Sequence, residues 1–460
     1  MTTEPQTRSL WVDVSTLAGW RGNPTGIART LQGLVQHWLP DDRLPVRLCR
    51  FDAVGGGFVE VAAAELMRGR SPAPPPPAPP KPVPLPSRRW SSLYWHRLNT
   101  ELRDGSWHLY HALRCGGRLA RSVVRATAAN ARRAARGFSA RRPPLPFQPG
   151  DALFLGGTGW SDGPPLAALA DLRRTLPLKV AHLIYDITPL RVPHLCAPAM
   201  SRAFARWLPA AVTGSDLIVT ISRYSRKDLE GYCRDQGLTP PPVVELRIGD
   251  EPGDDDSAAP PPDLIARNPG SFALFVSSMA LHKNQPLLFA VWRRLIERHG
   301  GGVPTLVLVG GPGWRAEQIL ADLAADATLS RHVAYLPRTD DRQLRWLYRN
   351  CLFTLFPSHY EGWGLPVAES LRHGKYCVCS AATSLPEVGG ELVDYHDPLD
   401  GVGCLRLVER ALFEPGFLAG REERIRTQYR CTGWKETAAA AFAAVDRHFG
   451  LLPSAAREAA

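Results

Sequence analysis

The sequence has no apolar stretch that approaches the roughly 18 to 20 residues needed to span a bilayer. Its first residues, Met1 to Arg8, lack the basic segment followed by an apolar segment that marks a secretory signal. These two features argue against an integral membrane protein and against a secreted one. We therefore expect a cytoplasmic protein that is soluble, or at most peripheral on a membrane.

Closely spaced cysteines are scarce as well. The nine cysteines are scattered, and only Cys377 and Cys379 lie close together, on a strand-like run where alternate side chains point the same way. A disulfide framework or a zinc site would need tighter clustering. We therefore expect reduced, buried thiols in a reducing compartment.

Acidic residues are nearly absent from residues 88–142. This stretch holds 13 arginines against two acids, Glu101 and Asp104, and the excess equals the net charge of +11 of the whole chain. The basicity is therefore local, and the rest of the chain is electrically balanced. A nearly polyproline run at 71–86 precedes the stretch and predicts an extended spacer.

Aromatic side chains are interleaved with these arginines: Trp90, Tyr94, Trp95, Trp107 and Tyr110. The pattern is typical of an amphipathic insert on an anionic membrane, where each basic residue contributes roughly 1 kcal/mol. A solvated insertion without a partner is the alternative. Nucleic-acid binding would instead predict a steep salt dependence, and we do not expect it. Residues 88–142 are thus a candidate contact for a membrane surface or a lipid-linked acceptor.

What the sequence does contain is an alternation of short apolar runs and longer helical patterns, which predicts an α/β fold with parallel sheets. In the first half, strands are predicted at 10–14, 151–155, 179–184 and 217–220, and helices at 27–39, 198–212 and 223–236. In the second half, strands are predicted at 272–276, 305–309, 333–336, 352–356 and 376–379, and helices near 285–299, 315–325, 341–349 and 366–373.

Two doubly wound, Rossmann-like halves are the simplest architecture for this alternation. Residues 251–270 hold five prolines, three successive aspartates and two glycines, which is a linker composition. We predict an N-terminal domain at 1–250 with an insert at 71–148, a C-terminal domain at 271–433, and a final helix and tail at 434–460. Ligands of such domain pairs bind at the carboxyl ends of the strands, here in a central cleft.

The sharpest motif occupies residues 357–369, Pro-Ser-His-Tyr-Glu-Gly-Trp-Gly-Leu-Pro-Val-Ala-Glu, and begins where a predicted strand ends. Gly362 and Gly364 flank Trp363, so the backbone can approach a ligand closely. Pro366 suits the first turn of a helix, whose start offers free N–H groups and a partial positive charge. Such a helix start is suited to a diphosphate.

Two carboxylates, those of Glu361 and Glu369, frame this motif. They are placed to hold the two ends of an extended ligand through its hydroxyls, and each charged hydrogen bond of that kind contributes roughly 1.5 to 3 kcal/mol. Either glutamate alone is also compatible with an ordinary strand–turn–helix, whose acid serves the helix dipole. The complete spacing favours a ligand site.

The segment resembles the Glu-x7-Glu signature of glycosyltransferase family 4, whose members are retaining enzymes of the GT-B fold. Other segments similar to landmarks of the family are Phe-Val-Ser-Ser-Met-Ala-Leu-His-Lys-Asn at 275–284, Leu-Val-Leu-Val-Gly-Gly-Pro-Gly-Trp at 306–314, and Ser-Leu-Pro-Glu-Val-Gly-Gly at 384–390. The resemblance covers 271–400 strongly and the region before 250 more weakly, and the insert at 71–148 has no specific match. It implies a GT-B fold in which 434–460 returns to the first domain.

The resemblance also implies roles for single residues. Lys283 would bind the diphosphate of a nucleotide-sugar donor, Glu361 the hydroxyls of the transferred sugar, and Glu369 the ribose. Main-chain groups that follow Glu361 would line the sugar and the phosphate: Gly362, Trp363, Gly364 and Leu365. His282 stands where the family usually has an arginine, so half of the expected cationic clamp is changed; an ordinary surface histidine is the alternative.

In the first half, residues 20–29 (Trp-Arg-Gly-Asn-Pro-Thr-Gly-Ile-Ala-Arg) resemble a glycine-containing loop of a polysaccharide-assembling branch of the same family. Gly22, Thr25 and Gly26 would approach the donor phosphates or the acceptor across the cleft. An ordinary turn between a strand and a helix is the alternative.

Residues 184–190, Ile-Tyr-Asp-Ile-Thr-Pro-Leu, are similar to a strand end that often reads His-Asp in the family, and Tyr185 replaces the histidine. Asp186 is then the candidate that orients the acceptor. A turn-capping aspartate is the alternative.

The family implies departure and attack on the same face of the sugar, with the leaving phosphate taking the acceptor proton. No side-chain base, metal or cofactor is then needed, and Asp254 to Asp256 are best explained as solvated linker. The branch suggests mannose from GDP-mannose as donor. It also suggests a glycan or lipid-linked glycan as acceptor, in capsule or lipopolysaccharide O-chain synthesis at the inner face of the plasma membrane.

Other functions remain open at this point. A GT-B epimerase would need acid and base residues around the sugar that the sequence does not offer, and a phosphorylase would need a pyridoxal-binding lysine context. A non-catalytic sugar-nucleotide or membrane-binding protein is favoured by His282 and Tyr185. Such a protein would bind the donor to saturation without turnover.

Overall fold

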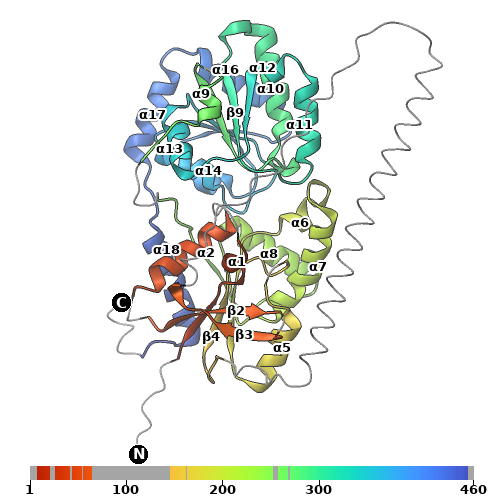
Figure 1. Cartoon of the computed structure of the whole chain (residues 1–460), viewed down its shortest axis with the longest axis vertical. Coiled ribbons are helices and arrows are strands. Elements are labelled where there is room, and N and C mark those ends of the chain that lie inside the picture. Colours follow the sequence, from red (N-terminus) through yellow and green to blue (C-terminus); the bar gives the residue numbers. More distant parts are fainter. Residues whose placement is uncertain are drawn as a thin grey trace, which may run out of the picture. The chain divides into compact units, whose positions relative to one another are not determined.

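The computed structural model describes residues 8–20, 26–41, 44–53, 55–64, 146–161, 163–251, 257–267 and 270–453. The arginine-rich stretch at 88–142 and the aspartates at 254–256 lie outside these residues. Two mainly parallel sheets, one in each half of the chain, belong to one compact unit, apart from Asp52 and Gly57 at the ends of two strands (Figure 1).

The first sheet has seven strands in the order β3-β2-β1-β4-β5-β6-β7. They are β1 (Leu10–Asp13), β2 (Val46–Asp52), β3 (Gly57–Glu60), β4 (Ala152–Leu155), β5 (Lys179–Ile184), β6 (Leu217–Thr220) and β7 (Val243–Glu245). Each pair from β2–β1 through β6–β7 is parallel. Every residue of β1, β4 and β6 is buried, as is typical of strands covered on both faces.

Helices cover both faces of this sheet. They are α1 (Ser15–Gly19), α2 (Ile27–Trp38), α5 (Leu166–Thr175), α6 (Thr188–Arg191), the 3₁₀ turn η1 (Pro193–Leu195), α7 (Pro198–Thr213) and α8 (Arg223–Asp235). On one face, Trp38 of α2 packs edge-on against Phe154 of β4, with ring centroids 5.3 Å apart. On the other, Leu153 of β4 packs in a separate cluster with Leu169 of α5. The first half is therefore doubly wound.

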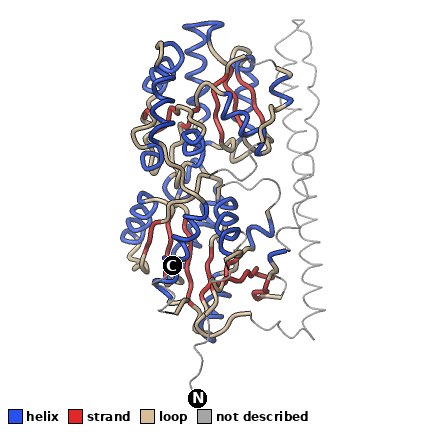
Figure 2. Tube along the Cα trace, turned by 90° about the vertical axis from the view of Figure 1, so that its left-hand side faces the viewer, coloured by secondary structure: helices blue, strands red, loops and turns tan. Residues whose placement is uncertain are grey.

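The second sheet has six strands in the order β10-β9-β8-β11-β12-β13, and all its neighbouring pairs are parallel. Helices flank the strands of this half, as they do those of the first (Figure 2). They are β8 (Phe272–Val276), β9 (Thr305–Val309), β10 (Val333–Leu336), β11 (Thr354–Phe356), β12 (Cys377–Ser380) and β13 (Asp394–His396). The helices are α9 (Pro262–Ile265), η2 (Leu281–Lys283), α10 (Gln285–His299), η3 (Gly300–Gly302), α11 (Ala316–Ala325), α12 (Leu329–His332), α13 (Asp341–Asn350), α14 (Leu365–Arg372), α15 (Leu385–Gly389), α16 (Gly401–Phe413), α17 (Phe417–Gln428) and α18 (Trp434–Phe449).

The strand order reverses once in each sheet, between β1 and β4 in the first and between β8 and β11 in the second. In open parallel sheets, ligands bind beyond the carboxyl ends of the strands at such a switch point. A ligand site is therefore expected at the loops that follow β8 and β11. These loops contain Lys283 and Glu361, both predicted as site residues.

The last helix, α18, packs against α2 of the first half (Figure 1). Trp38 Nε1 donates a hydrogen bond of 2.7 Å to the carbonyl of Ala438. A Cβ atom at Gly33 would lie 2.3 Å from the Trp434 ring, and one at Gly249 would lie 2.6 Å from it. These two glycines leave room for the indole, which joins α2, the segment after β7 and the start of α18.

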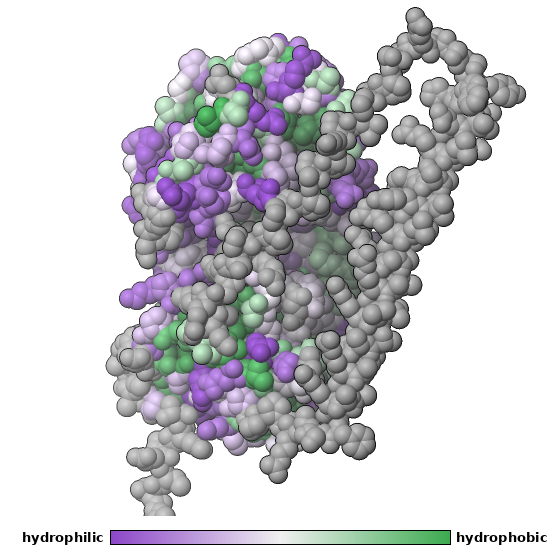
Figure 3. Space-filling model, in the orientation of Figure 1, coloured by the Kyte–Doolittle hydropathy of each residue, from purple (hydrophilic) through white to green (hydrophobic). Residues whose placement is uncertain are grey.

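No described helix is both long and apolar enough to cross a membrane. On the face drawn in Figure 3, hydrophilic and hydrophobic residues are interspersed.

Seven described cysteines are buried, but Cys431 is exposed, so the expectation of buried thiols was wrong there. Cys431 lies in the segment between α17 and α18, outside both sheets.

A buried acid at the end of β1 gives a pH-dependent stability. Asp13 is 2% exposed and accepts hydrogen bonds from the Ser15 amide (3.1 Å) and hydroxyl (2.5 Å). Burial raises the pKa of Asp13 from 3.8 to about 6. The native state therefore holds this proton more tightly than the unfolded state, and the contribution of Asp13 to stability falls as the pH rises through that interval.

We predict that Asp13→Asn removes this pH-dependent loss of stability. The loss amounts to roughly 3 kcal/mol, because each unit of difference between the folded and unfolded pKa corresponds to about 1.4 kcal/mol. Urea unfolding of both proteins between pH 4 and pH 8 measures it. The difference in free energy of unfolding, variant minus wild type, should increase as the pH rises from 4 to 8. Two parallel curves would show that Asp13 ionises normally.

Candidate functional site

The predicted bend forms between β11 and α14. Gly364 precedes α14 with φ 123°, and a Cβ atom there would lie 2.5 Å from Leu385 Cδ2, so only glycine fits. Pro366 has no N–H, and no described residue accepts a hydrogen bond from the main-chain N–H of Gly364 or Leu365. The start of α14 thus keeps donors available for a ligand.

Two hydroxyls fix the main chain of this bend. Thr383 Oγ1 accepts a hydrogen bond from the Glu361 amide (2.9 Å) and donates one to the Glu361 carbonyl (2.8 Å). Ser384 Oγ lies 3.0 Å from the carbonyl oxygen of Glu361 and 2.9 Å from that of Trp363. The landmark segment at 384–390 therefore supports the bend, which leaves the side chain of Glu361 free to act elsewhere.

The structure brings Lys283 to Glu361. Lys283 Nζ donates a hydrogen bond of 2.6 Å to Glu361 Oε1, and the two side chains are 16% and 11% exposed. Asn284 holds this geometry: it adopts the left-handed conformation (φ 63°), and its Nδ2 donates to the carbonyls of Pro357 (3.0 Å) and Pro398 (2.8 Å). Asparagine tolerates this conformation better than most residues. The cation after β8 thus meets the acid after β11 at the switch point.

His282 lies beside Lys283 and is half-buried, unlike an ordinary surface histidine. Its carbonyl accepts a hydrogen bond of 2.8 Å from the amide of His359. Burial, followed by the nearby charge of Lys283, lowers the pKa of His282 to about 3. In the ligand-free protein His282 is therefore uncharged at neutral pH and does not supply a second cation.

Asp186 follows β5 and caps the turn that leads into α6. One carboxylate oxygen accepts a hydrogen bond of 2.9 Å from the Thr188 amide at the start of α6, as a turn cap does. A Cβ atom at Gly362 would lie 2.9 Å from the other oxygen and 2.8 Å from the carbonyl of Tyr185. Burial raises the pKa of Asp186, against the opposing effect of Thr188. The cap thus sits directly against the bend.

Glu369 is buried in α14, and both its oxygens have partners. Oε2 accepts a hydrogen bond of 2.8 Å from the Tyr348 hydroxyl, and Oε1 accepts one of 2.5 Å from Arg29 Nη1. Sequence reasoning identified neither partner. Arg29 stood in the quoted glycine-containing loop, but its contact spans 340 residues and no local pattern reveals it.

A cavity of about 210 Å³ adjoins this pair. Its lining comes from α2, the segment after β7, α13, α14 and α18: Arg29, Gln32, Gly33, Gln36, Gly249, Asp250, Glu251, Asp341, Leu344, Arg345, Tyr348, Leu365, Glu369, Arg372, His373 and Trp434. Gly26 lies one turn before Arg29 and precedes α2 with φ 49°. Gly22 and Thr25 lie outside the described residues.

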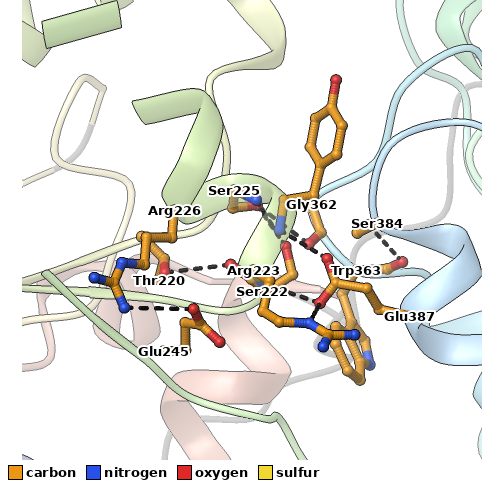
Figure 4. A network of polar contacts seen from close by, with 11 residues as sticks. Thr220, Ser222, Arg223, Ser225, Arg226, Glu245, Gly362, Trp363, Ser384 and Glu387 are labelled. Atoms are coloured by element: carbon orange, nitrogen blue, oxygen red, sulfur yellow. Dashed lines mark hydrogen bonds and ion pairs between the residues drawn. The ribbon is translucent and has the colours of Figure 1, made fainter. Parts of the chain in front are cut away.

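The first turn of α8 meets the bend from the other half of the chain (Figure 4). Ser225 Oγ donates a hydrogen bond of 3.3 Å to the carbonyl of Gly362. The carboxylate of Glu387 accepts hydrogen bonds from the amides of Arg223 (3.0 Å) and Tyr224 (2.7 Å). The site therefore offers the cation of Lys283, the main-chain N–H groups at the start of α14, and carboxylates from the loops after β5 and β11 and from α14. This combination is suited to a phosphorylated sugar.

Known proteins are similar to parts of the chain, and a family model matches a segment of its second half. Residues 262–394 match the family of glycosyl transferases group 1. Over 233 residues the chain is 28% identical to an O-antigen chain mannosyltransferase B of Escherichia coli, covering 47% of this chain and 56% of that protein. It is 24% identical over 245 residues to a serotype-specific mannosyltransferase, WbdA, of the same species, covering 51% and 30%. The matches thus span less than two thirds of either relative.

Two further comparisons agree with these. A D-inositol 3-phosphate glycosyltransferase of Acidothermus cellulolyticus is 32% identical over 202 residues, which is 42% of this chain and 44% of that protein. The solved structure of a sucrose-phosphate synthase from Thermosynechococcus elongatus superposes with a TM-score of 0.58 at 14% identity, covering 97% of this chain and 100% of that one. The resemblance seen in the sequence and the GT-B fold class are confirmed.

Proposed function

We propose, from the match of residues 262–394 to the glycosyl transferases group 1, that this chain transfers a hexose from a nucleotide-diphosphate sugar to a growing surface glycan, with retention of configuration. The observation that carries the proposal is the Lys283–Glu361 pair, with 2.6 Å between Nζ and Oε1, beside the unbonded N–H groups at the start of α14. The names of the Escherichia coli relatives support mannose as the sugar, and hence GDP-mannose as the donor.

In the proposed reaction, Lys283 and the N–H groups of Gly364 and Leu365 face the diphosphate. They stabilise the negative charge that develops as the bond between the anomeric carbon and the phosphate oxygen breaks. The acceptor oxygen forms its bond to that carbon on the same face, and its proton passes to the departing phosphate. Glu361 holds sugar hydroxyls, and Asp186, which lies against Gly362, orients the acceptor. The reaction as proposed uses no metal and no cofactor.

The acceptor and the place of action are proposals of the same kind. A relative named for the O-antigen chain supports a glycan or lipid-linked glycan acceptor. Such an acceptor would be reached at the inner face of the plasma membrane, in the cytoplasm. The 13 arginines of residues 88–142 would provide the attraction to an anionic surface.

Release of nucleoside diphosphate tests the proposal. The protein is incubated with GDP-mannose, GDP-glucose, UDP-glucose or UDP-galactose, each with and without a lipid-linked mannan primer, and the product is examined by proton NMR. We expect acceptor-dependent release of GDP from GDP-mannose and an α-linked product from the α-linked donor. A β-linked product would contradict retention. Saturable binding of the donor without release, for every acceptor tried, would favour the non-catalytic alternative.

A further inference from the structure

Arg29 is a cation of the first half of the chain that reaches two acids of the second. Its Nη1 lies 2.5 Å from Glu369 Oε1 in α14, and its Nη2 lies 3.7 Å from Asp341 Oδ1 at the start of α13. The charge of Glu369 is the largest influence on Arg29 and raises its pKa further above the ordinary value. Arg29 therefore keeps its charge at any working pH.

This ion pair engages the carboxylate of Glu369, the group to which the family resemblance assigns the ribose of the donor. A ribose hydroxyl would hydrogen-bond to an oxygen of Glu369, but Oε1 is held by Arg29 and Oε2 by the Tyr348 hydroxyl at 2.8 Å. The Glu369 side chain is only 7% exposed, so little of its surface is left for a third donor. A donor that reaches this buried carboxylate therefore competes for space with the two present partners.

The two partners differ in their freedom to move. Tyr348 is fully buried and its ring stacks on His373 with centroids 5.2 Å apart, so its hydroxyl cannot leave without disrupting the packing. The Arg29 side chain is 31% exposed, and the cavity of about 210 Å³ lies directly beside it. Asp341 Oδ1 lies 3.7 Å from Arg29 Nη2 and is placed to pair with the guanidinium if it leaves Glu369. Arg29 is the partner that can yield.

We infer that the Arg29–Glu369 ion pair is a latch on the donor site: it closes over Glu369 in the ligand-free protein, and the ribose of the donor displaces it. The inference rests on the proposed function, together with the ribose-binding role that the family resemblance implies for Glu369. Other contacts between the halves, such as Glu387 with the amides of Arg223 and Tyr224 (Figure 4), do not involve Glu369. Loss of the latch therefore frees Glu369 without separating the two halves.

Calorimetric titration with GDP, UDP and ADP tests the latch. Because the competing ion pair is lost, Arg29→Met should bind the preferred nucleotide about 5-fold more tightly than the wild type, the change expected for a partly exposed ion pair. Arg29→Lys, which keeps the charge, should bind much as the wild type does. The matched control is Arg47→Met, which removes another arginine–glutamate pair of the same half, with Glu60 (2.7 Å), far from α14 in the chain.

A second background makes the result specific. In Glu369→Gln protein the Arg29→Met change should no longer alter nucleotide affinity, because the competed carboxylate is gone. Unchanged or weaker binding by Arg29→Met in the otherwise wild-type protein would overturn the latch while leaving the donor site in place. Failure of the wild type to bind any of the three nucleotides would contradict the proposed function and the latch together.

Discussion

Glu361→Ala is expected to lower turnover by a factor on the order of 100 or more, comparable to the loss of one preorganised contact to a transition state. The substitution removes the carboxylate that would hold the hydroxyls of the transferred sugar. It also leaves Lys283, whose side chain is 16% exposed, without the oxygen that it contacts at 2.6 Å. Turnover is measured as acceptor-dependent release of nucleoside diphosphate at saturating donor.

The chain offers a matched control for this experiment. Glu422 pairs with Lys375 in the same half of the protein, at 3.4 Å and with similar burial, but belongs to α17 and not to the bend. Glu422→Ala should cost some stability and leave turnover near the wild-type value. If Glu361→Ala also retained near-normal turnover, the role proposed for Glu361 would be wrong.

Lys283→Met is expected to have the second large effect, because its charge would stabilise the departing diphosphate. A charged hydrogen bond contributes roughly 1.5 to 3 kcal/mol, which corresponds to about a 10-fold to 150-fold loss in kcat/KM. His282 cannot compensate, since burial lowers its pKa to about 3 and leaves it uncharged. The substitution also leaves Glu361 unpaired near Asp186, where the two acids repel each other.

Three further variants separate the charge of Lys283 from its packing. Lys283→Arg keeps the charge and should recover part of the lost kcat/KM, whereas Lys283→Gln should not. Lys375→Met removes a lysine of similar burial that pairs with Glu422 and should leave kcat/KM unchanged. Equal losses in the Arg and Met variants would mean that Lys283 acts through packing alone.

The sequence predicted the strands of both sheet centres because they are buried on both faces. The runs at 217–220 and 305–309, for example, were expected from continuous apolar residues and form β6 and β9 with the same bounds. The bend at 357–364 was also foreseen, since a proline just inside a helix and two glycines before it leave few other conformations.

Four strands were not predicted: β2, β3, β7 and β13. Three of them, β3, β7 and β13, lie at sheet edges. An edge strand has a neighbouring strand on one side only and is less completely covered by apolar side chains. β2 carries arginines at 47 and 50, and β7 has no fully buried residue. Such strands lack the continuous apolar run that made the central ones visible, and only pairing with a distant neighbour defines them.

The site was predicted where local chemistry defines it and missed where tertiary contacts do. The pairing of Lys283 with the bend followed from two motifs that resemble one family. The contacts of Arg29 and Tyr348 with Glu369 join elements 340 and 21 residues apart, and no periodicity connects them. The support that Thr383 gives to Glu361 depends likewise on a backbone geometry (φ 52°) that residue type does not predict.

A crystal structure with GDP-mannose bound tests the central claim most directly. We expect the diphosphate oxygens about 3 Å from Lys283 Nζ and from the amides of Gly364 and Leu365, with the sugar hydroxyls at the Glu361 carboxylate and the ribose at Glu369 in place of Arg29. A donor bound away from the bend, or bound there with its diphosphate out of reach of Lys283, would contradict the proposed site.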